Sequence, residues 1–247
     1  MLIVSNWKAY VESPEEAKKL YALSLKLSRK GHDLVIVPSA PHVGLLSTAT
    51  KKSDVHLGAQ DVSLETAGAH TGEITAGTLH NLGVAYVLVG HSERRALGET
   101  DEVVLEKVRR VLALGMTPIV CIGESVRDEQ GMYLGVVRRM IELVLAPLSP
   151  KERTQLIFAY EPVWAIGKSG ADAIQEEDLT EMVLYIRKVL SEFLPGKASE
   201  KTRVLYGGSV EASIIRSLAG GTGVDGFLIG HASAEVASYK ALVEALL

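Results

Sequence analysis

Short runs of apolar, β-branched residues alternate along the whole chain with longer segments of helical periodicity, and this alternation constrains the fold most. Strands that are buried on both faces have continuous apolar sequences, as in Val35-Ile36-Val37. A helix or helical turn follows each strand, which predicts parallel strands. The strand candidates are Leu2–Asn6, Leu34–Pro38, Val55–Gln60, Val84–Gly90, Thr117–Ile122, Gln155–Glu161, Arg203–Tyr206 and Gly226–Gly230.

Helix boundary signals occupy the segments between these strands. The segment Ser13–Glu16 combines an N-cap serine, a proline at the first helical position and an acidic first turn, and Gly31 follows as a stop signal. A second helix opens at Thr100, and we expect it to end near Gly115. Gln175–Leu194 is a third, amphipathic helix.

Eight strand–helix units in 247 residues, without a linker or a change of composition, fit one closed (β/α)8 barrel. An open, doubly wound parallel sheet is the alternative. We therefore expect a single α/β domain that spans residues 1–247. In both architectures the chemistry lies at the carboxyl ends of the strands, so these positions are the candidates for function.

Composition excludes several classes of protein. A hydrophobic fraction of 47%, 23% charged residues and a net charge of −4 fit a soluble globular protein and do not indicate nucleic acid or an anionic membrane as a partner. The sequence has no basic leader and no apolar run near the roughly 18 residues of a membrane span. Cys121 is the only cysteine, which favours a reducing compartment. We expect a cytoplasmic protein.

Two polar residues follow the first and fourth strands. Lys8 would direct a positive charge into the barrel mouth, although a lone lysine beyond a strand is more often a solvated surface residue. His91 precedes a helix start, where the helix dipole disfavours imidazolium. A neutral imidazole can donate a hydrogen bond to a carbonyl and exchange protons with it, and a structural histidine is the alternative. The histidines lack metal-site spacing, so we expect no metal.

The sixth strand ends at Glu161 and continues into an apolar segment. A carboxylate that leaves an apolar run is partly desolvated, which favours its protonated form and makes it a stronger base. The alternative is a buried carboxylate that pairs with an arginine. Val163, Trp164 and Ile166 should not lie in water, and they predict a lid that closes over a ligand and excludes solvent.

Glycine-rich turns follow the last two strands, at Tyr206–Val210 and Gly226–Ala232. Exposed backbone N–H groups at two helix starts favour a phosphate between these loops. A separate segment, Gly167–Ser169, resembles the end of a nucleotide-binding P-loop. The first glycine of such a loop is replaced by Pro162, which has no N–H to donate, so we do not favour nucleotide binding.

A series of motifs that covers the whole chain resembles the triosephosphate isomerase family. The motifs are Asn6-Trp7-Lys8, Gly58-Ala59-Gln60, Thr71-Gly72-Glu73, His91-Ser92-Glu93-Arg94-Arg95, Gly98-Glu99-Thr100-Asp101-Glu102, Cys121-Ile122-Gly123-Glu124, Tyr160-Glu161-Pro162-Val163-Trp164-Ala165-Ile166-Gly167, Tyr206-Gly207-Gly208-Ser209-Val210 and Asp225-Gly226-Phe227-Leu228-Ile229-Gly230. The resemblance implies a (β/α)8 TIM barrel that interconverts dihydroxyacetone phosphate and D-glyceraldehyde 3-phosphate in glycolysis and gluconeogenesis, without a cofactor or metal.

The same resemblance implies the catalytic roles. Glu161 is the base that moves a proton between neighbouring carbons through an enediolate. His91, in its neutral form, polarises the carbonyl and relays protons between the two oxygens. Lys8 and Asn6 stabilise the developing negative charge, and Glu93 supports Lys8 and His91.

Substrate binding and assembly are also implied by the family. The backbone N–H groups of a set of loop residues hold the phosphate, and a lid from Pro162 to about Ala173 covers the site. This set consists of Gly167, Ser209, Gly230 and His231. The long segment Asp61–Ile74 projects into a second subunit of a symmetric homodimer, where Thr71 approaches the partner's Lys8 and Asn6.

Four positions depart from the family pattern. The hinge Lys168-Ser169-Gly170 replaces Thr-Gly-Lys, and we expect altered lid kinetics with unchanged chemistry. His231 replaces a glycine, and we expect weaker substrate binding with catalysis retained. Ser5 replaces a glycine with little expected effect, and His70 stands where an aromatic residue is usual in the dimer loop. Another sugar-phosphate barrel enzyme and a barrel that serves only as a scaffold are the rival functions.

Overall fold

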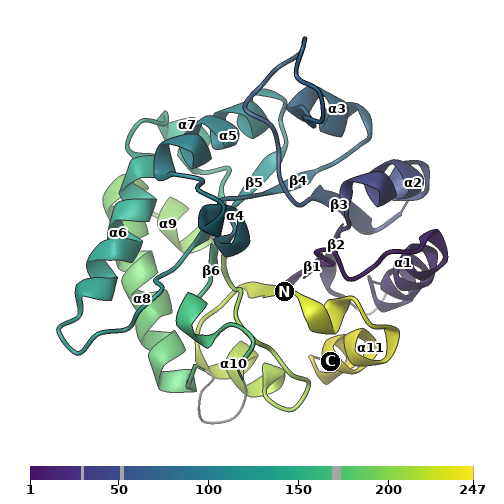
Figure 1. Cartoon of the computed structure of the whole chain (residues 1–247). Coiled ribbons are helices and arrows are strands. Elements are labelled where there is room, and N and C mark those ends of the chain that lie inside the picture. The colour runs from purple at the N-terminus through teal and green to yellow at the C-terminus, as the bar shows by residue number, and fades with distance from the viewer. Residues whose placement is uncertain (29–30, 51–52, 169–173, 247) are drawn as a thin grey trace.

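The computed structural model describes residues 1–28, 31–50, 53–168 and 174–246 of the chain. Its strands are all parallel and form a closed barrel, in which each strand pairs with the next along the chain and β8 pairs with β1 (Figure 1). The predicted (β/α)8 barrel is therefore confirmed, and the open-sheet alternative is wrong. The strands are β1 (Leu2–Asn6), β2 (Asp33–Val37), β3 (Val55–Ala59), β4 (Tyr86–Val89), β5 (Thr117–Ile122), β6 (Ile157–Tyr160), β7 (Val204–Tyr206) and β8 (Gly226–Ile229).

Most strand boundaries differ from the prediction by one or two residues, because strand pairing ends before the apolar run does. β4 stops before Gly90, whose φ of +70° is not that of a strand. β6 stops before Glu161, although the N–H of Glu161 still donates to the carbonyl of Ile122 over 2.8 Å. This bond fixes the backbone of Glu161 at the rim of the barrel.

Helices surround the barrel on its outer side (Figure 1). The α-helices are α1 (Pro14–Ser28), α2 (Ala40–Thr50), α3 (Ala76–Asn81), α4 (Ser92–Ala96), α5 (Asp101–Ala113), α6 (Met132–Leu145), α7 (Pro150–Arg153), α8 (Glu176–Phe193), α9 (Ala198–Lys201), α10 (Ile215–Gly221) and α11 (Val236–Ala245), and two short 3-10 helices are η1 (Val163–Ala165) and η3 (His231–Ser233). None of the helices in the described ranges is both long and apolar enough to span a membrane.

The predicted helix signals lie where the helices begin and end. The hydroxyl of Ser13 accepts the N–H of Glu16 at 3.2 Å and caps α1, and Thr100 caps α5 in the same way. Helix α1 ends at Ser28, before Gly31, which has a φ of +100°. Helix α8 matches the predicted Gln175–Leu194, with these two residues as its caps.

Side chains fill both sides of the barrel wall. Alternate strand residues point inward and outward, so the inner face of the barrel and the layer beneath the helices form separate clusters. The inner cluster contains Leu2, Val4, Val35, Val37, Leu88, Ile119, Cys121, Ile157, Ala159, Leu205 and Leu228. All of these side chains are buried, so the barrel is a packed core.

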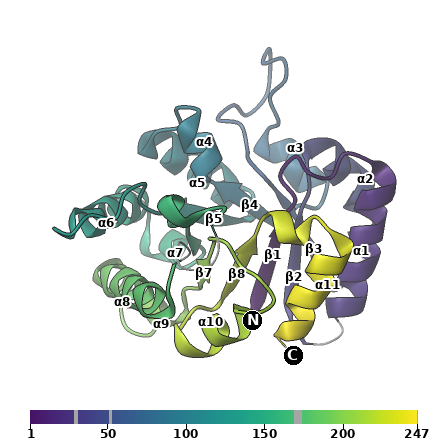
Figure 2. The ribbon, with the colours of Figure 1, turned by 60° about the horizontal axis from the view of Figure 1, so that its bottom comes forward.

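The loop between β3 and α3 extends away from the barrel (Figure 2). Its base is closed by a hydrogen bond from the N–H of Ser63 to the carbonyl of Ile74, over 2.9 Å. Residues 66–73 at its tip are exposed. The predicted long loop Asp61–Ile74 is thus present, and it has no helix or strand of its own.

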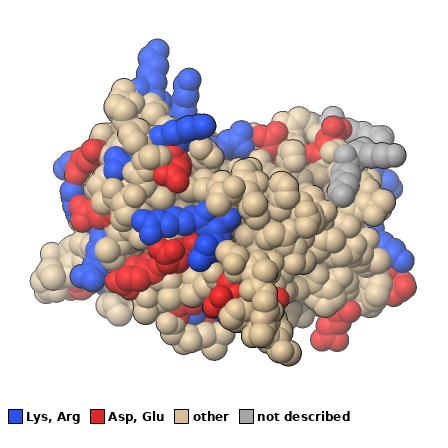
Figure 3. Space-filling view, turned by 90° about the horizontal axis from the view of Figure 1, so that it is seen from above, with Lys and Arg blue, Asp and Glu red and all other residues tan. Residues whose placement is uncertain are grey.

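Acidic and basic side chains lie next to one another on the face drawn in Figure 3, where neither sign forms a continuous field. This mixture agrees with the small net charge of −4. This face therefore offers no extended basic surface to a ligand with negative charge.

Candidate active site

A cavity of about 290 Å³ opens at the carboxyl ends of the strands, and it collects most of the predicted site residues. Those that line it are Asn6, Lys8, His91, Glu161, Gly167, Ser209, Gly230 and His231. Glu93 lies beside the cavity, where it contacts Lys8. Thr71 does not reach it, because it lies in the exposed tip of the projecting loop. Residues far apart in the sequence meet here because parallel strands in a barrel all end at one rim.

Glu161 is almost fully buried, with 2% of its surface exposed. Its Oε1 lies 3.3 Å from Nε2 of His91, and its Oε2 accepts the backbone N–H of Ser92 at 3.0 Å. No ion pair joins it to an arginine in the described part of the chain, so the alternative of an arginine-paired structural carboxylate is wrong. A buried carboxylate that faces a histidine in a cavity is placed to accept a proton from a bound molecule.

His91 is the N-cap of α4, and this position determines which ring nitrogen carries its proton. Nδ1 accepts the backbone N–H of Glu93 at 3.2 Å, so this nitrogen presents a lone pair. The proton of a neutral ring is then on Nε2, which faces Glu161 and the cavity. This placement would let a neutral ring donate a hydrogen bond from Nε2 into the cavity.

Lys8 lies in a strained backbone conformation, with a φ of +46° that L residues rarely adopt. The turn is held by the side chain of Asn6, which accepts the N–H of Lys8 at 3.1 Å, and by Gln60, whose Nε2 donates to the Lys8 carbonyl at 2.8 Å. Nζ of Lys8 lies 2.6 Å from Oε1 of Glu93. The interpretation of Lys8 as a solvated surface residue is wrong, because its ammonium is fixed at the cavity.

Ser209 connects the two loops that were expected to bind phosphate. Its hydroxyl accepts the N–H of Gly167 at 2.8 Å and lies 3.4 Å from the carbonyl of Ala165. Two glycines before it allow close approach, because a Cβ on Gly207 would lie 2.9 Å from Cγ of Glu161 and one on Gly208 would lie 2.2 Å from the Tyr206 hydroxyl. Substitution of either glycine would therefore displace a neighbour at the site.

The helix starts differ from the prediction at both phosphate loops. No helix begins at Val210, since α10 starts only at Ile215, and β8 is followed by the three-residue η3. The expected pair of converging helix N-termini is therefore wrong. The donors available to an anion here are loop N–H groups and the first turn of a 3-10 helix.

Glu124 is a site residue to which the sequence analysis gave no role. It is 1% exposed, and its Oε1 accepts hydrogen bonds from the Tyr160 hydroxyl at 2.9 Å and from Nε1 of Trp164 at 2.8 Å. Burial and the charge of Glu124 raise the pKa of Tyr160, so the hydroxyl stays protonated and remains a donor. Glu124 thereby anchors the first part of the predicted lid, including Val163, whose N–H donates to the Glu124 carbonyl at 3.0 Å.

The predicted lid is only partly within the described residues. Val163–Ala165 form η1, Trp164 is half-buried, and Lys168 is exposed. The hinge residues Ser169 and Gly170, and the lid as far as Ala173, lie outside the described residues.

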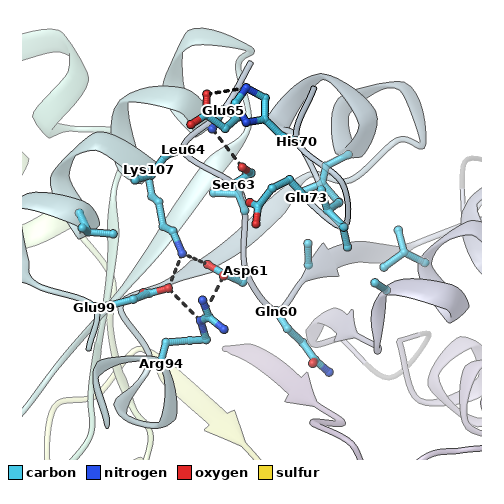
Figure 4. A pocket seen from close by; sticks show the side chains of 18 of the residues that line it. Gln60, Asp61, Ser63, Leu64, Glu65, His70, Glu73, Arg94, Glu99 and Lys107 are labelled. Carbon is cyan, nitrogen blue, oxygen red and sulfur yellow. Dashed lines mark hydrogen bonds and ion pairs between the residues drawn. The ribbon is translucent and has the colours of Figure 1, made fainter. Parts of the chain in front are cut away.

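A second cavity, of about 610 Å³, lies beneath the projecting loop (Figure 4). Its wall carries an ion cluster around the buried side chains of Lys107 and Glu99. Nζ of Lys107 contacts Asp61 at 2.6 Å and also Glu99, and Arg94 contacts Glu99 at 2.8 Å. Near the loop tip, Nε2 of His70 lies 3.2 Å from Glu65. The cavity therefore combines apolar walls with charges that already have partners.

Comparison with known proteins finds one family that matches almost the whole chain. A family model described as triosephosphate isomerase matches residues 1–246. A triosephosphate isomerase of Carboxydothermus hydrogenoformans is 38% identical over 246 residues, which cover 98% of this chain and 97% of the relative. Another, of Thermus thermophilus, is 39% identical with the same coverage. Together with the barrel and with Glu161 and His91 at its mouth, these matches mean that the chain belongs to the triosephosphate isomerase family and is an isomerase of triose phosphates.

Proposed function

We propose that Glu161 and His91 carry the proton transfers that interconvert dihydroxyacetone phosphate and D-glyceraldehyde 3-phosphate in this protein. The observation that carries this proposal is the distance of 3.3 Å between Oε1 of Glu161 and Nε2 of His91, within a cavity that Lys8 also lines. A general base and a neutral hydrogen-bond donor then face the same small volume, as an enolisation requires.

The reaction proceeds by transfer of one proton between two carbons. Glu161 removes a proton from the carbon beside the carbonyl, and the electron pair of that C–H bond moves toward the carbonyl oxygen to form the enediolate. His91 donates its Nε2 proton to this oxygen and takes one from the neighbouring hydroxyl. Glu161 then returns its proton to the other carbon, so the enzyme is regenerated without a net change.

Two residues stabilise the charge that develops on the oxygens, and a third holds one of them in place. Lys8 and Asn6 present an ammonium and an amide to the enediolate, and Glu93 holds Lys8 through the contact of 2.6 Å. The Ser92 N–H bonds to Oε2 of Glu161, so Oε1, which faces His91, is the oxygen that would take the proton.

Loop N–H groups bind the phosphate in this proposal. Four residues of these loops line the cavity, and their N–H groups are the proposed donors: Gly167, Ser209, Gly230 and His231. The lid from Pro162 to about Ala173 excludes water, which protects the enediolate from loss of phosphate. Neither a metal nor a cofactor is needed for these steps.

The protein acts as a symmetric homodimer in this proposal. The exposed tip of the Asp61–Ile74 loop and the cavity of about 610 Å³ beside it support a self-complementary interface, in which loop and cavity of two copies meet. Thr71 of one subunit then completes the partner's site near Lys8 and Asn6. Assembly and catalysis are thus coupled.

The cellular setting follows from the same reasoning. One domain, residues 1–247, functions in the cytoplasm in glycolysis and gluconeogenesis, without nucleic acid or a membrane as partner. The pairing of β1 with β8 supports a single folding unit, because it joins the two ends of the chain.

The decisive experiment measures triose phosphate interconversion by the purified protein and by Glu161→Gln. We expect an active wild type and a loss in kcat of about 10²- to 10⁴-fold in the variant, the usual contribution of a general base. The isosteric amide keeps the hydrogen-bonding shape but cannot take the proton. An inactive wild type that is folded and dimeric would contradict the proposal and favour a scaffold role.

A further inference from the structure

Two aromatic rings meet at the mouth of the catalytic cavity, and one of them, His231, stands at a position that departs from the family pattern. The ring centroids of Tyr10 and His231 are 4.9 Å apart, and the rings are edge-to-face with an interplanar angle of 69°. Both residues line the cavity. They come from the loops after β1 and β8, which lie side by side because these two strands close the barrel.

Each of the two loops is held rigidly. The N–H of Tyr10 donates to the carbonyl of Trp7 at 3.0 Å, and Trp7 is fully buried. On the other side, Ser233 is fully buried, and its N–H and hydroxyl both bond to the carbonyl of Gly230, at 2.9 and 2.8 Å. The ring contact therefore joins two fixed backbones.

The Tyr10 ring is not buried in the core, since the residue is 53% exposed. A contact at the surface must therefore orient this ring, and the ring contact of Tyr10 is with His231. An edge-to-face pair of this kind is favoured by the quadrupole of the aromatic ring.

The backbone next to His231 lies close to Lys8, one of the residues proposed to stabilise the enediolate. The preceding Gly230 lies so close to Lys8 that an added Cβ would be 3.2 Å from the Lys8 Cε. The imidazole at the next position lines the same cavity, and it contacts the ring of Tyr10 at the mouth.

We propose that Tyr10 is a positioning residue, whose ring holds the imidazole of His231 against the β1 side of the mouth and keeps the phosphate subsite open. This inference rests on the proposed function, because it needs the loops after β7 and β8 to bind phosphate. Tyr10 acts on substrate binding through His231, and it takes no part in proton transfer.

The test compares Tyr10→Ala in the wild-type and His231→Gly backgrounds. In the wild type, we expect the KM for dihydroxyacetone phosphate and the Kd for inorganic phosphate to rise roughly 2- to 12-fold, the range of aromatic pair energies, with kcat unchanged within error. Tyr10→Phe keeps the ring and should retain wild-type values. His231→Gly alone should lower KM, and Tyr10→Ala should have no further effect in that background. Leu184→Ala, an exposed change on α8, is the control.

Three outcomes overturn the inference. Tyr10→Ala without effect in the wild type would mean that the ring contact does not matter for binding. An equal effect in both backgrounds would mean that Tyr10 does not act through His231. A higher KM for His231→Gly would make the imidazole itself a phosphate ligand. Failure of the proposed function would be seen separately, as an inactive wild type. In that case, calorimetric binding of inorganic phosphate to the variants would still test the contact between Tyr10 and His231.

Discussion

The backbone N–H of Gly167 donates a hydrogen bond to the hydroxyl of Ser209 over 2.8 Å. This bond joins the loop after β6 to the loop after β7, and both of its partners are proposed to bind phosphate. A phosphate that accepts the Gly167 N–H must therefore take the place of the serine oxygen or share the proton with it. Ser209 prepares the orientation of this donor before the substrate arrives.

Substitution of Ser209 should weaken substrate binding more than catalysis. In Ser209→Ala the Gly167 N–H loses its partner, and we expect KM to rise about 2- to 12-fold, as for loss of a hydrogen bond of about 0.5–1.5 kcal/mol. Steady-state kinetics with dihydroxyacetone phosphate measures this. Ser217→Ala is a matched control, because that hydroxyl bonds only to the carbonyl of Ile214 among the described residues. A KM that is identical in the two variants would contradict the role of Ser209.

The ion pairs of Glu99 with Lys107 and Arg94 should make the free energy of unfolding depend on pH. Burial opposes ionisation of Glu99, but hydrogen bonds from Lys107 and Arg94 outweigh it, so the pKa of Glu99 is lowered from its ordinary 4.5. The lower pKa in the folded state means that the stabilisation is complete above pH 4.5 and is lost as the pH falls through the folded-state pKa. Urea unfolding of Glu99→Gln should therefore depend less on pH in this acid range.

The control for this effect is Glu106→Gln on α5, an exposed carboxylate that pairs with Arg109. Surface pairs contribute little to stability, so this variant should retain the wild-type pH dependence. Equal acid sensitivity of Glu99→Gln and the wild type would refute the assignment.

The thiol of Cys121 should be unreactive in the folded protein. Burial, together with the negative charge of Glu161, raises the pKa of this thiol well above its ordinary value. Because the thiolate is the reactive form, we expect slow labelling by a disulfide reagent in native buffer and fast labelling in denaturant. Both labelling rates can be followed by the absorbance of the chromophore that the reagent releases. Fast labelling of the active, folded enzyme would show that Cys121 is accessible.

A charge at the tip of the projecting loop should dissociate the proposed homodimer. In Thr71→Glu, an added carboxylate would be buried at the interface beside a lysine that is already paired with Glu93, and a buried charge without its own partner costs about 3–5 kcal/mol. Sedimentation velocity over a dilution series should then detect monomers, with a parallel loss of kcat. Ser191→Glu adds the same charge to an exposed position of α8 and should remain dimeric. A monomeric wild type, or a dimeric Thr71→Glu, would contradict the proposal.

Much of the site could be predicted from the sequence, because the barrel converts sequence position into spatial position. Glu161 and His91 each follow an apolar run, and parallel strands bring the ends of such runs to one rim. The closed parallel barrel therefore explains why Nε2 of His91 and Oε1 of Glu161 lie only 3.3 Å apart.

Contacts that depend on side-chain orientation could not be predicted in this way. The bond from Trp164 to Glu124 and the ring contact of Tyr10 with His231 join distant loops, and no local pattern reports which rotamers meet. The late start of α10 at Ile215 was missed for a local reason: a glycine-rich turn after a strand indicates a loop but does not fix where the following helix begins.

The packed interior of the barrel determines where the two triose phosphates enter and leave the protein. Buried side chains such as Leu2, Val35 and Leu205 fill the barrel axis, so the described residues provide no route to the opposite end. Substrate and product share one doorway at the strand ends. Each triose phosphate must leave before the other can enter, so each acts as a competitive inhibitor of the other's conversion.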